Sequence, residues 1–93
     1  MAVRVVVQFT ADSKAIADQQ LEGLAERAKS VRQEPGCLQF EVFRSVARPE
    51  QWALIELWES QAVLDERARA RGGGPPPLAA GVKRTIEHYE QHA

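Results

Sequence analysis

Apolar and polar residues alternate along this chain in two patterns, and each pattern predicts one kind of element. Four segments rich in β-branched and aromatic side chains are predicted to be strands. They are residues 3–9, 37–46, 51–59 and 82–89. In residues 14–33 the apolar positions instead recur every three or four residues, which indicates one face of a helix.

A second helix is predicted to begin after its N-cap Ser60 and to end near Arg71. The run of glycines and prolines at residues 72–77 ends it, because glycine is unfavourable in a helix and proline lacks the amide hydrogen. A short polar connection at residues 47–50 predicts an antiparallel hairpin. The order strand, helix, strand, strand, helix, strand predicts an α+β fold of the ferredoxin-like βαββαβ kind. Right-handed crossovers would then give a four-stranded antiparallel sheet with two helices on one face.

Two helices cover only one face of such a sheet, yet the strands are apolar on both faces. Trp52 and Trp58 share one face of residues 51–59, while Ile55 and Leu57 share the other. An exposed apolar sheet face is typical of an interface, so we expect a homodimer through this face. The alternative is that the long loop after the second helix covers it.

Length and charge restrict the class of protein. A chain of 93 residues suffices for one domain, so we expect a single domain over residues 1–93. The net charge of −1 gives no nucleic-acid footprint, and we interpret Arg67, Arg69 and Arg71 as a solvated helix end. No apolar run is long enough for a signal peptide or a membrane span. We therefore expect a cytoplasmic protein without a nucleic-acid or membrane partner.

The cysteine and histidine content argues against metal and disulfide chemistry. Cys37 is alone, so no disulfide can form within the chain, and no cluster of Cys and His has zinc spacing. The lone cysteine fits a reducing compartment. No metal site is expected.

Three sequence pieces between Glu34 and Leu64 point to a known family. They are Glu34-Pro35-Gly36-Cys37, Phe40-Glu41-Val42, and Glu56-Leu57-Trp58-Glu59-Ser60 running into Ala62 and Leu64. The stretch resembles the antibiotic biosynthesis monooxygenase family of small dimeric α+β barrels. The resemblance implies oxygenation of quinols or polycyclic phenols without a metal or flavin cofactor. Members of the family also break down haem or isomerise small sugar-like signals.

The haem-degrading members carry an asparagine on the first strand, a tryptophan at the end of the third strand and a histidine on the second helix. Trp58 matches the tryptophan, and Gln8 stands near the asparagine position. Residues 60–71 contain no histidine, so we do not expect haem binding.

Glu56 and His88 are the candidate catalytic residues. Glu56 lies two residues before Trp58 on one strand face, and a carboxylate beside tryptophans can have a raised pKa and act as a base. The alternative for Glu56 is an ion pair with Arg44 or Arg84. His88 has an imidazole suited to proton transfer, although a surface position is the alternative. The other histidine, His92, is expected in a frayed tail.

The candidate substrate-binding residues are Trp58, Phe40, Gln8 and Arg44. Trp58 is expected to form a pocket wall for a flat aromatic compound, with core packing as the alternative. Gln8 and Arg44 are long polar side chains that can donate hydrogen bonds to a substrate oxygen, with exposure or cross-strand pairing as the alternative. Trp52 is interpreted as a packing or interface residue.

Two functional hypotheses remain open. The first is a cofactor-independent monooxygenase that oxidises a quinol or an aromatic polyketide-like small molecule. The second is a non-catalytic dimer of the same fold that binds a small molecule or serves as an interaction module. The absence of a histidine in the second helix motivates the second hypothesis.

Overall fold

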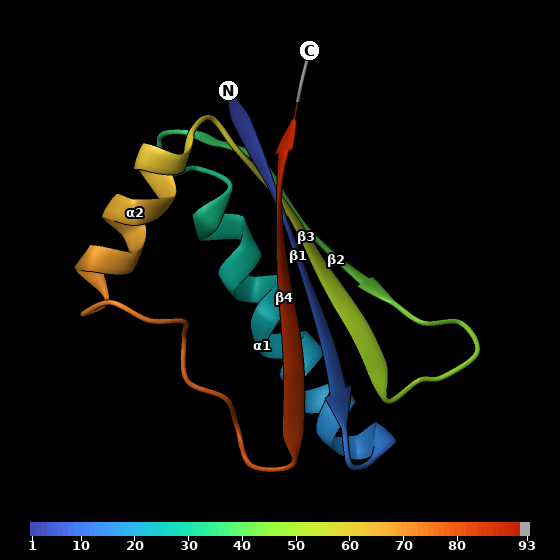
Figure 1. The fold of residues 1–93 in the computed structure, drawn as a ribbon. Coiled ribbons are helices and arrows are strands. Elements are labelled where there is room, and N and C mark those ends of the chain that lie inside the picture. The colour runs from blue at the N-terminus through green and yellow to red at the C-terminus, as the bar shows by residue number, and fades with distance from the viewer. Residues whose placement is uncertain (92–93) are drawn as a thin grey trace.

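The computed structural model describes residues 1–91, so His92 lies outside the described residues. The elements follow in the predicted order: β1 Ala2–Ala11, α1 Lys14–Val31, β2 Cys37–Arg44, β3 Gln51–Trp58, α2 Gln61–Ala70 and β4 Val82–Gln91. The strands form one antiparallel sheet in the order β2-β3-β1-β4. Both helices lie on the same side of this sheet (Figure 1). The ferredoxin-like α+β fold is thus confirmed.

Each helix begins at a serine N-cap, and the prediction of Ser60 for the second helix is confirmed. The Ser13 hydroxyl accepts a hydrogen bond of 3.2 Å from the Ile16 N–H, and the Ser60 hydroxyl accepts one of 3.3 Å from the Val63 N–H. Neither helix in residues 1–91 is long and apolar enough to cross a membrane.

The inner face of the sheet, defined as the face toward the helices, carries the core. Val3, Val5 and Val7 of β1 are 4 to 6% exposed, and Trp58 of β3 is completely buried. Strand register brings successive inner residues of neighbouring strands into rows, such as His88, Val5, Glu56 and Phe40. These rows fix which side chains meet on the inner face.

One position in β2 departs from the predicted alternation. Cys37 pairs with Trp58 but Gln39 pairs with Leu57, so a β-bulge inserts one extra residue. Leu38 is 58% exposed, whereas Phe40, two residues later, is 2% exposed, so simple alternation does not hold here. The bulge lets Cys37 pack against the same core cluster as Phe40.

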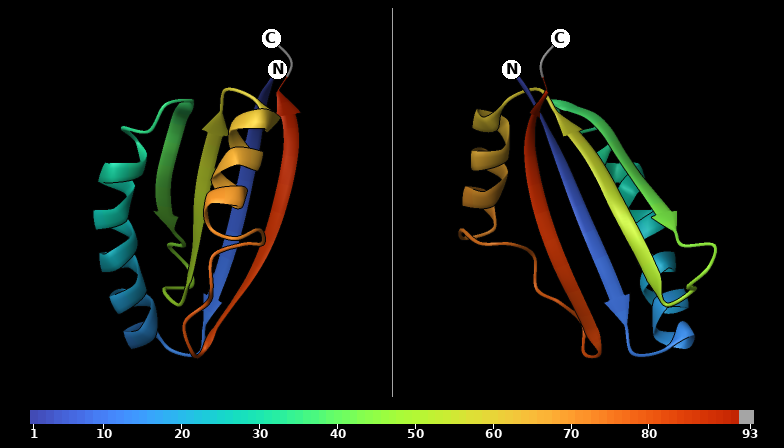
Figure 2. Two further views of the ribbon diagram at one scale, coloured as in Figure 1. Left: turned by 90° about the vertical axis from the view of Figure 1, so that its left-hand side faces the viewer. Right: turned by 45° about the vertical axis from the view of Figure 1, so that its right-hand side comes forward.

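The outer face of the sheet, defined as the face away from the helices, retains apolar side chains. Val6, Ile55 and Leu57 are half-buried there, while Phe43 is 47% and Tyr89 51% exposed. The loop between α2 and β4 lies on the helix side in both views of Figure 2. That loop therefore does not cover the outer face, and the alternative cover considered from the sequence is wrong.

Candidate active site

A cavity of about 1070 Å³ lies between the inner face of the sheet and the helices. Its floor is formed by inner residues of all four strands, among them Val5, Val7 and Leu54. Its walls are the facing sides of α1 and α2 and the loop residues 74–79. The loop runs from α2 to β4 on the helix side of the sheet (Figure 2). The fold therefore provides a half-open cavity with room for a small molecule.

Both candidate catalytic residues lie on the floor of this cavity. Glu56 and His88 are in the same row, with Val5 of the intervening strand between them. Two strand spacings of about 4.8 Å place their Cα atoms on the order of 10 Å apart. Their side chains therefore flank one position above Val5, which a substrate can occupy. Phe40, which continues the row on β2, also lines the cavity.

The surroundings of Glu56 make its carboxyl group a stronger base than usual. Burial raises the pKa of Glu56, because desolvation disfavours the charged form. The indole N–H of Trp58 donates a hydrogen bond of 2.7 Å to Glu56 Oε1, and this bond and the charges of Arg67, Arg27 and His88 oppose the rise in pKa. Among the described residues Glu56 forms no ion pair, so the alternative ion pair with Arg44 or Arg84 is not present.

Trp58 lies on the inner face at the end of β3, but it does not line the cavity. Its side chain is completely buried in the core cluster and does not belong to the cavity wall, so the structure places it in the packing position that the sequence left as the alternative. Its visible contribution to the site is the hydrogen bond to Glu56. Trp58 therefore positions the carboxylate.

Arg67 is a site residue that the sequence analysis missed. It was interpreted as part of a solvated helix end, but it is half-buried and its guanidinium carbon lies 4.4 Å from the centre of the Trp58 ring. It also pairs with Glu34 at 3.3 Å and lines the cavity. Its spacing from Leu64, three residues earlier on the inward side of α2, was the available signal. The neighbouring Arg69 is exposed and pairs with Glu66, as expected of a solvated position.

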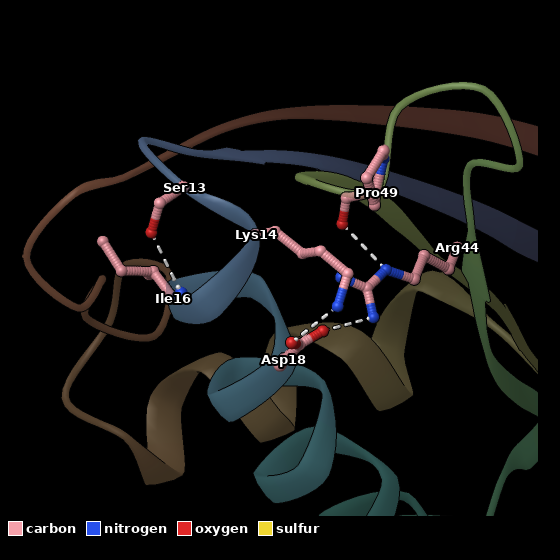
Figure 3. A network of polar contacts seen from close by, with 6 residues as sticks. All are labelled: Ser13, Lys14, Ile16, Asp18, Arg44 and Pro49. Atoms are coloured by element: carbon pink, nitrogen blue, oxygen red, sulfur yellow. Dashed lines mark hydrogen bonds and ion pairs between the residues drawn. The ribbon is translucent and has the colours of Figure 1, made fainter.

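Gln8 and Arg44 lie away from the cavity. Gln8 is exposed on the outer face, where it pairs with Ala53 and Thr85, so the sheet separates it from Glu56. Arg44 forms an ion pair of 2.7 Å with Asp18 and donates a hydrogen bond of 2.7 Å to the Pro49 carbonyl (Figure 3). The structure does not bring either residue together with Glu56 and His88.

Trp52 and Phe9 form an aromatic part of the cavity floor that was not predicted from the sequence. Their rings are stacked with centroids 5.2 Å apart, and both residues line the cavity. Trp52 was interpreted only as a packing or interface residue. Within residues 1–91 no group of three or more His, Cys, Asp and Glu side chains is placed to hold a metal ion.

The fold and this cavity define the chain as a small α+β protein with a cavity between sheet and helices. The sequence model of the antibiotic biosynthesis monooxygenase family matches residues 2–71. The chain belongs to this family, as the resemblance implied.

Solved structures share the whole fold at low sequence identity. A conserved protein of unknown function from Bacteroides thetaiotaomicron is 19% identical, with a TM-score of 0.79 over 97% of each chain. An antibiotic biosynthesis monooxygenase is 21% identical, with a TM-score of 0.72 over 98% of this chain and 99% of that one. A conserved protein from Methanosarcina mazei is 18% identical, with a TM-score of 0.72 over 99% and 94%. The search of curated proteins finds no match.

Proposed function

We propose that this protein is a cofactor-independent monooxygenase that oxidises a quinol or an aromatic polyketide-like small molecule. The observation that carries the proposal is the pair formed by Glu56 and His88 on the cavity floor. Glu56 is half-buried, and a carboxylate with a raised pKa accepts a proton from a weak carbon or oxygen acid more readily than an ordinary exposed one. Family membership supports the same reaction class.

A phenolic substrate with an acidic methylene group illustrates the proposed step. Glu56 takes a methylene proton, the resulting carbanion gives one electron to O₂, and the two radicals combine into a carbon-bound peroxide. Glu56 returns its proton to the peroxide and then removes the second methylene proton. The O–O bond breaks, and the released hydroxide takes that proton. One oxygen atom remains as a carbonyl and the other leaves as water, so no external reductant is needed.

His88 takes the second role in this proposal. His88 is exposed and lines the cavity in the same row as Val5 and Glu56, so its imidazole can donate a hydrogen bond to the phenolic oxygen as negative charge develops there. Gln8 and Arg44, the donors considered from the sequence, lie elsewhere. His88 is therefore the donor best placed for this role.

The test is oxygen uptake by chelator-treated protein with a panel of quinols and anthrones. Glu56→Gln and His88→Ala are each expected to lower turnover at least about 100-fold, the contribution typical of a positioned acid or base. Glu22→Gln, which removes a carboxylate from an exposed position on α1, should leave turnover unchanged. Ligand binding without oxygen uptake across the panel would overturn the proposal and support the non-catalytic binding dimer.

We also propose that a second copy of the chain covers the outer face. Apolar side chains among the polar ones of this face touch water in a single copy; they are the half-buried Val6, Ile55 and Leu57 and the exposed Phe43 and Tyr89. A two-fold dimer covers this face without another partner. The cavity opens on the opposite side of the sheet, so such a dimer leaves it accessible.

A further inference from the structure

Arg84 is a half-buried arginine on the cavity floor. It belongs to β4 and faces inward, opposite Phe9 of β1. Within residues 1–91 its side chain has no hydrogen-bond or ion-pair partner, whereas Arg67, on the other side of the cavity, pairs with Glu34. Partial burial of a guanidinium without an acceptor is unfavourable. A ligand that supplies an acceptor would remove this cost.

The position of Arg84 gives the cavity two chemically different ends. Arg84 lies in the row of Phe9 and Trp52, whose rings are stacked, and four residues before His88 on the same strand. At about 3.4 Å per residue, this separation is on the order of 13 Å along the floor. Ile86, which lies between the two ends, is 40% exposed. A flat polycyclic compound can therefore lie over Ile86 with one end at His88 and the other at Arg84.

The charges around the cavity favour an anionic group at the Arg84 end. The lining contains four arginines, Arg27, Arg67, Arg71 and Arg84, but only two acidic residues, Glu34 and Glu56. Glu34 is paired with Arg67, and Glu56 lies in the row of His88, so neither faces Arg84. The cavity is thus more basic than the chain as a whole, whose net charge is −1.

We propose that Arg84 binds a carboxylate of the substrate, so that the cavity selects flat aromatic compounds that carry an acidic group remote from the reacting ring. The planar guanidinium presents two parallel N–H donors that match a carboxylate. The inference rests on the proposed function for the identity of the reacting end, but recognition of the carboxylate requires no turnover. Arg84 is a specificity-determining residue in this proposal.

Binding of two inert probes tests the proposal. Anthraquinone-2-carboxylate and 2-(hydroxymethyl)anthraquinone share one ring system and differ in the charge of one substituent. Their dissociation constants are measured by quenching of the tryptophan fluorescence. Arg84→Gln should weaken binding of the carboxylate probe tenfold or more, and change binding of the neutral probe less than twofold. Lys83→Gln removes the same charge from the adjacent position on the outer face, and should change neither value.

Arg84→Lys separates charge from geometry. It keeps the positive charge but loses the planar pair of donors, so its affinity for the carboxylate probe should lie between those of wild type and Arg84→Gln. Equal binding of both probes to the wild type would overturn the inference, as would an equal loss of both probes in Arg84→Gln. A carboxylate preference in a protein that takes up no oxygen would leave this inference standing and reject the proposed oxygenation.

Discussion

Glu56 keeps its carboxyl group in surroundings that disfavour the charged form. Burial raises its pKa, and the Trp58 N–H and the nearby arginines only partly oppose this rise. Groups that serve chemistry often lower the stability of the fold in this way. Glu56 should therefore lower the free energy of unfolding by a measurable amount, and this amount should depend on pH.

Glu56→Gln is expected to raise the free energy of unfolding at pH 7. The folded pKa of Glu56 lies above the unfolded one, so the folded state binds the proton more tightly. The wild type consequently loses stability as pH rises through the folded pKa. Below about pH 4, where the side chain is protonated in both states, the variant should have no advantage. Urea denaturation at both pH values checks this. Glu22→Gln is the exposed control, and a gain independent of pH would contradict the prediction.

Trp58→Phe removes the hydrogen-bond donor to Glu56 while keeping an aromatic ring in the core. The hydrogen bond from Trp58 lowers the pKa of Glu56. Its loss should therefore raise this pKa further. The acidic limb of the kcat/KM profile should move to higher pH, and stability should fall by about 1–3 kcal/mol. Carbon-13 NMR of the glutamate carboxyl groups measures the same shift without turnover. An unchanged Glu56 titration would show that the bond does not tune the carboxylate.

Strand alternation explains which site residues could be predicted from the sequence. Glu56 was placed correctly, because alternation along β3 puts it on the same face as Trp58. Gln8 was not, because valines occur on both faces of β1 and leave its phase ambiguous. Trp58 packs in the core and Trp52 lines the cavity, which reverses the roles expected from the sequence. The difference depends on the distance between α2 and each end of β3, and no local sequence pattern encodes that distance.

At the scale of elements, Gly36 determines how closely α2 approaches the start of β2. Gly36 has φ +86°, and a Cβ atom added there would lie 2.9 Å from both Cγ atoms of Val63. Val63 packs against the main core cluster, so it has little freedom to move. The turn at Gly36 thus also positions the helix that carries Arg67.

Gly36→Ala is expected to destabilise the fold by more than Gly73→Ala. Both glycines have positive φ, 86° and 91°, so alanine is strained at either position by about 1–2 kcal/mol. Nothing lies within 4 Å of the added Cβ at Gly73, so the steric contact with Val63 affects only Gly36→Ala. Urea denaturation should show an additional loss of about 1–3 kcal/mol for that variant. Val63→Ala should restore part of it in the double variant, and equal losses at both glycines would refute this account.

The elements themselves were largely predictable. Ser60 and the run of glycines and prolines at residues 72–77 mark the two ends of the second helix, which ends as expected near Arg71. The β-bulge after Cys37 was not predicted, because it arises from pairing with β3 and has no local sequence signal. The burial of Arg67 was missed for a similar reason, since a charged residue is buried only when tertiary partners such as Trp58 and Glu34 are present.

At the scale of the whole molecule, the outer face of the sheet has apolar side chains that nothing covers in a single copy. Ile55 lies on this face in a central strand, with β1 on one side and β2 on the other. If a second copy covers the face, a charge at this position would be buried in the interface. Such a burial is strongly unfavourable without a partner charge.

Ile55→Asp is therefore expected to convert the dimer to a monomer. Sedimentation velocity at tens of micromolar protein should give one dimeric species for the wild type and a monomer for the variant. Ala25→Asp adds the same charge at an exposed position of α1 and should stay dimeric. A wild type that sediments as a monomer at this concentration would reject the proposed assembly.

The match to the family ends at residue 71, directly before the loop that forms one wall of the cavity. The proposed base Glu56 lies inside the matched part, whereas His88 and Arg84 lie beyond it, as do the wall residues 74–79. Gly72, Gly73 and Gly74 have open space around them, so this loop can change in length with little effect on packing. The contiguous piece from residue 72 to β4 could thus be exchanged between relatives as a unit. In the proposed reaction, such an exchange would alter the end of the cavity that recognises the substrate and would keep Glu56 as the base.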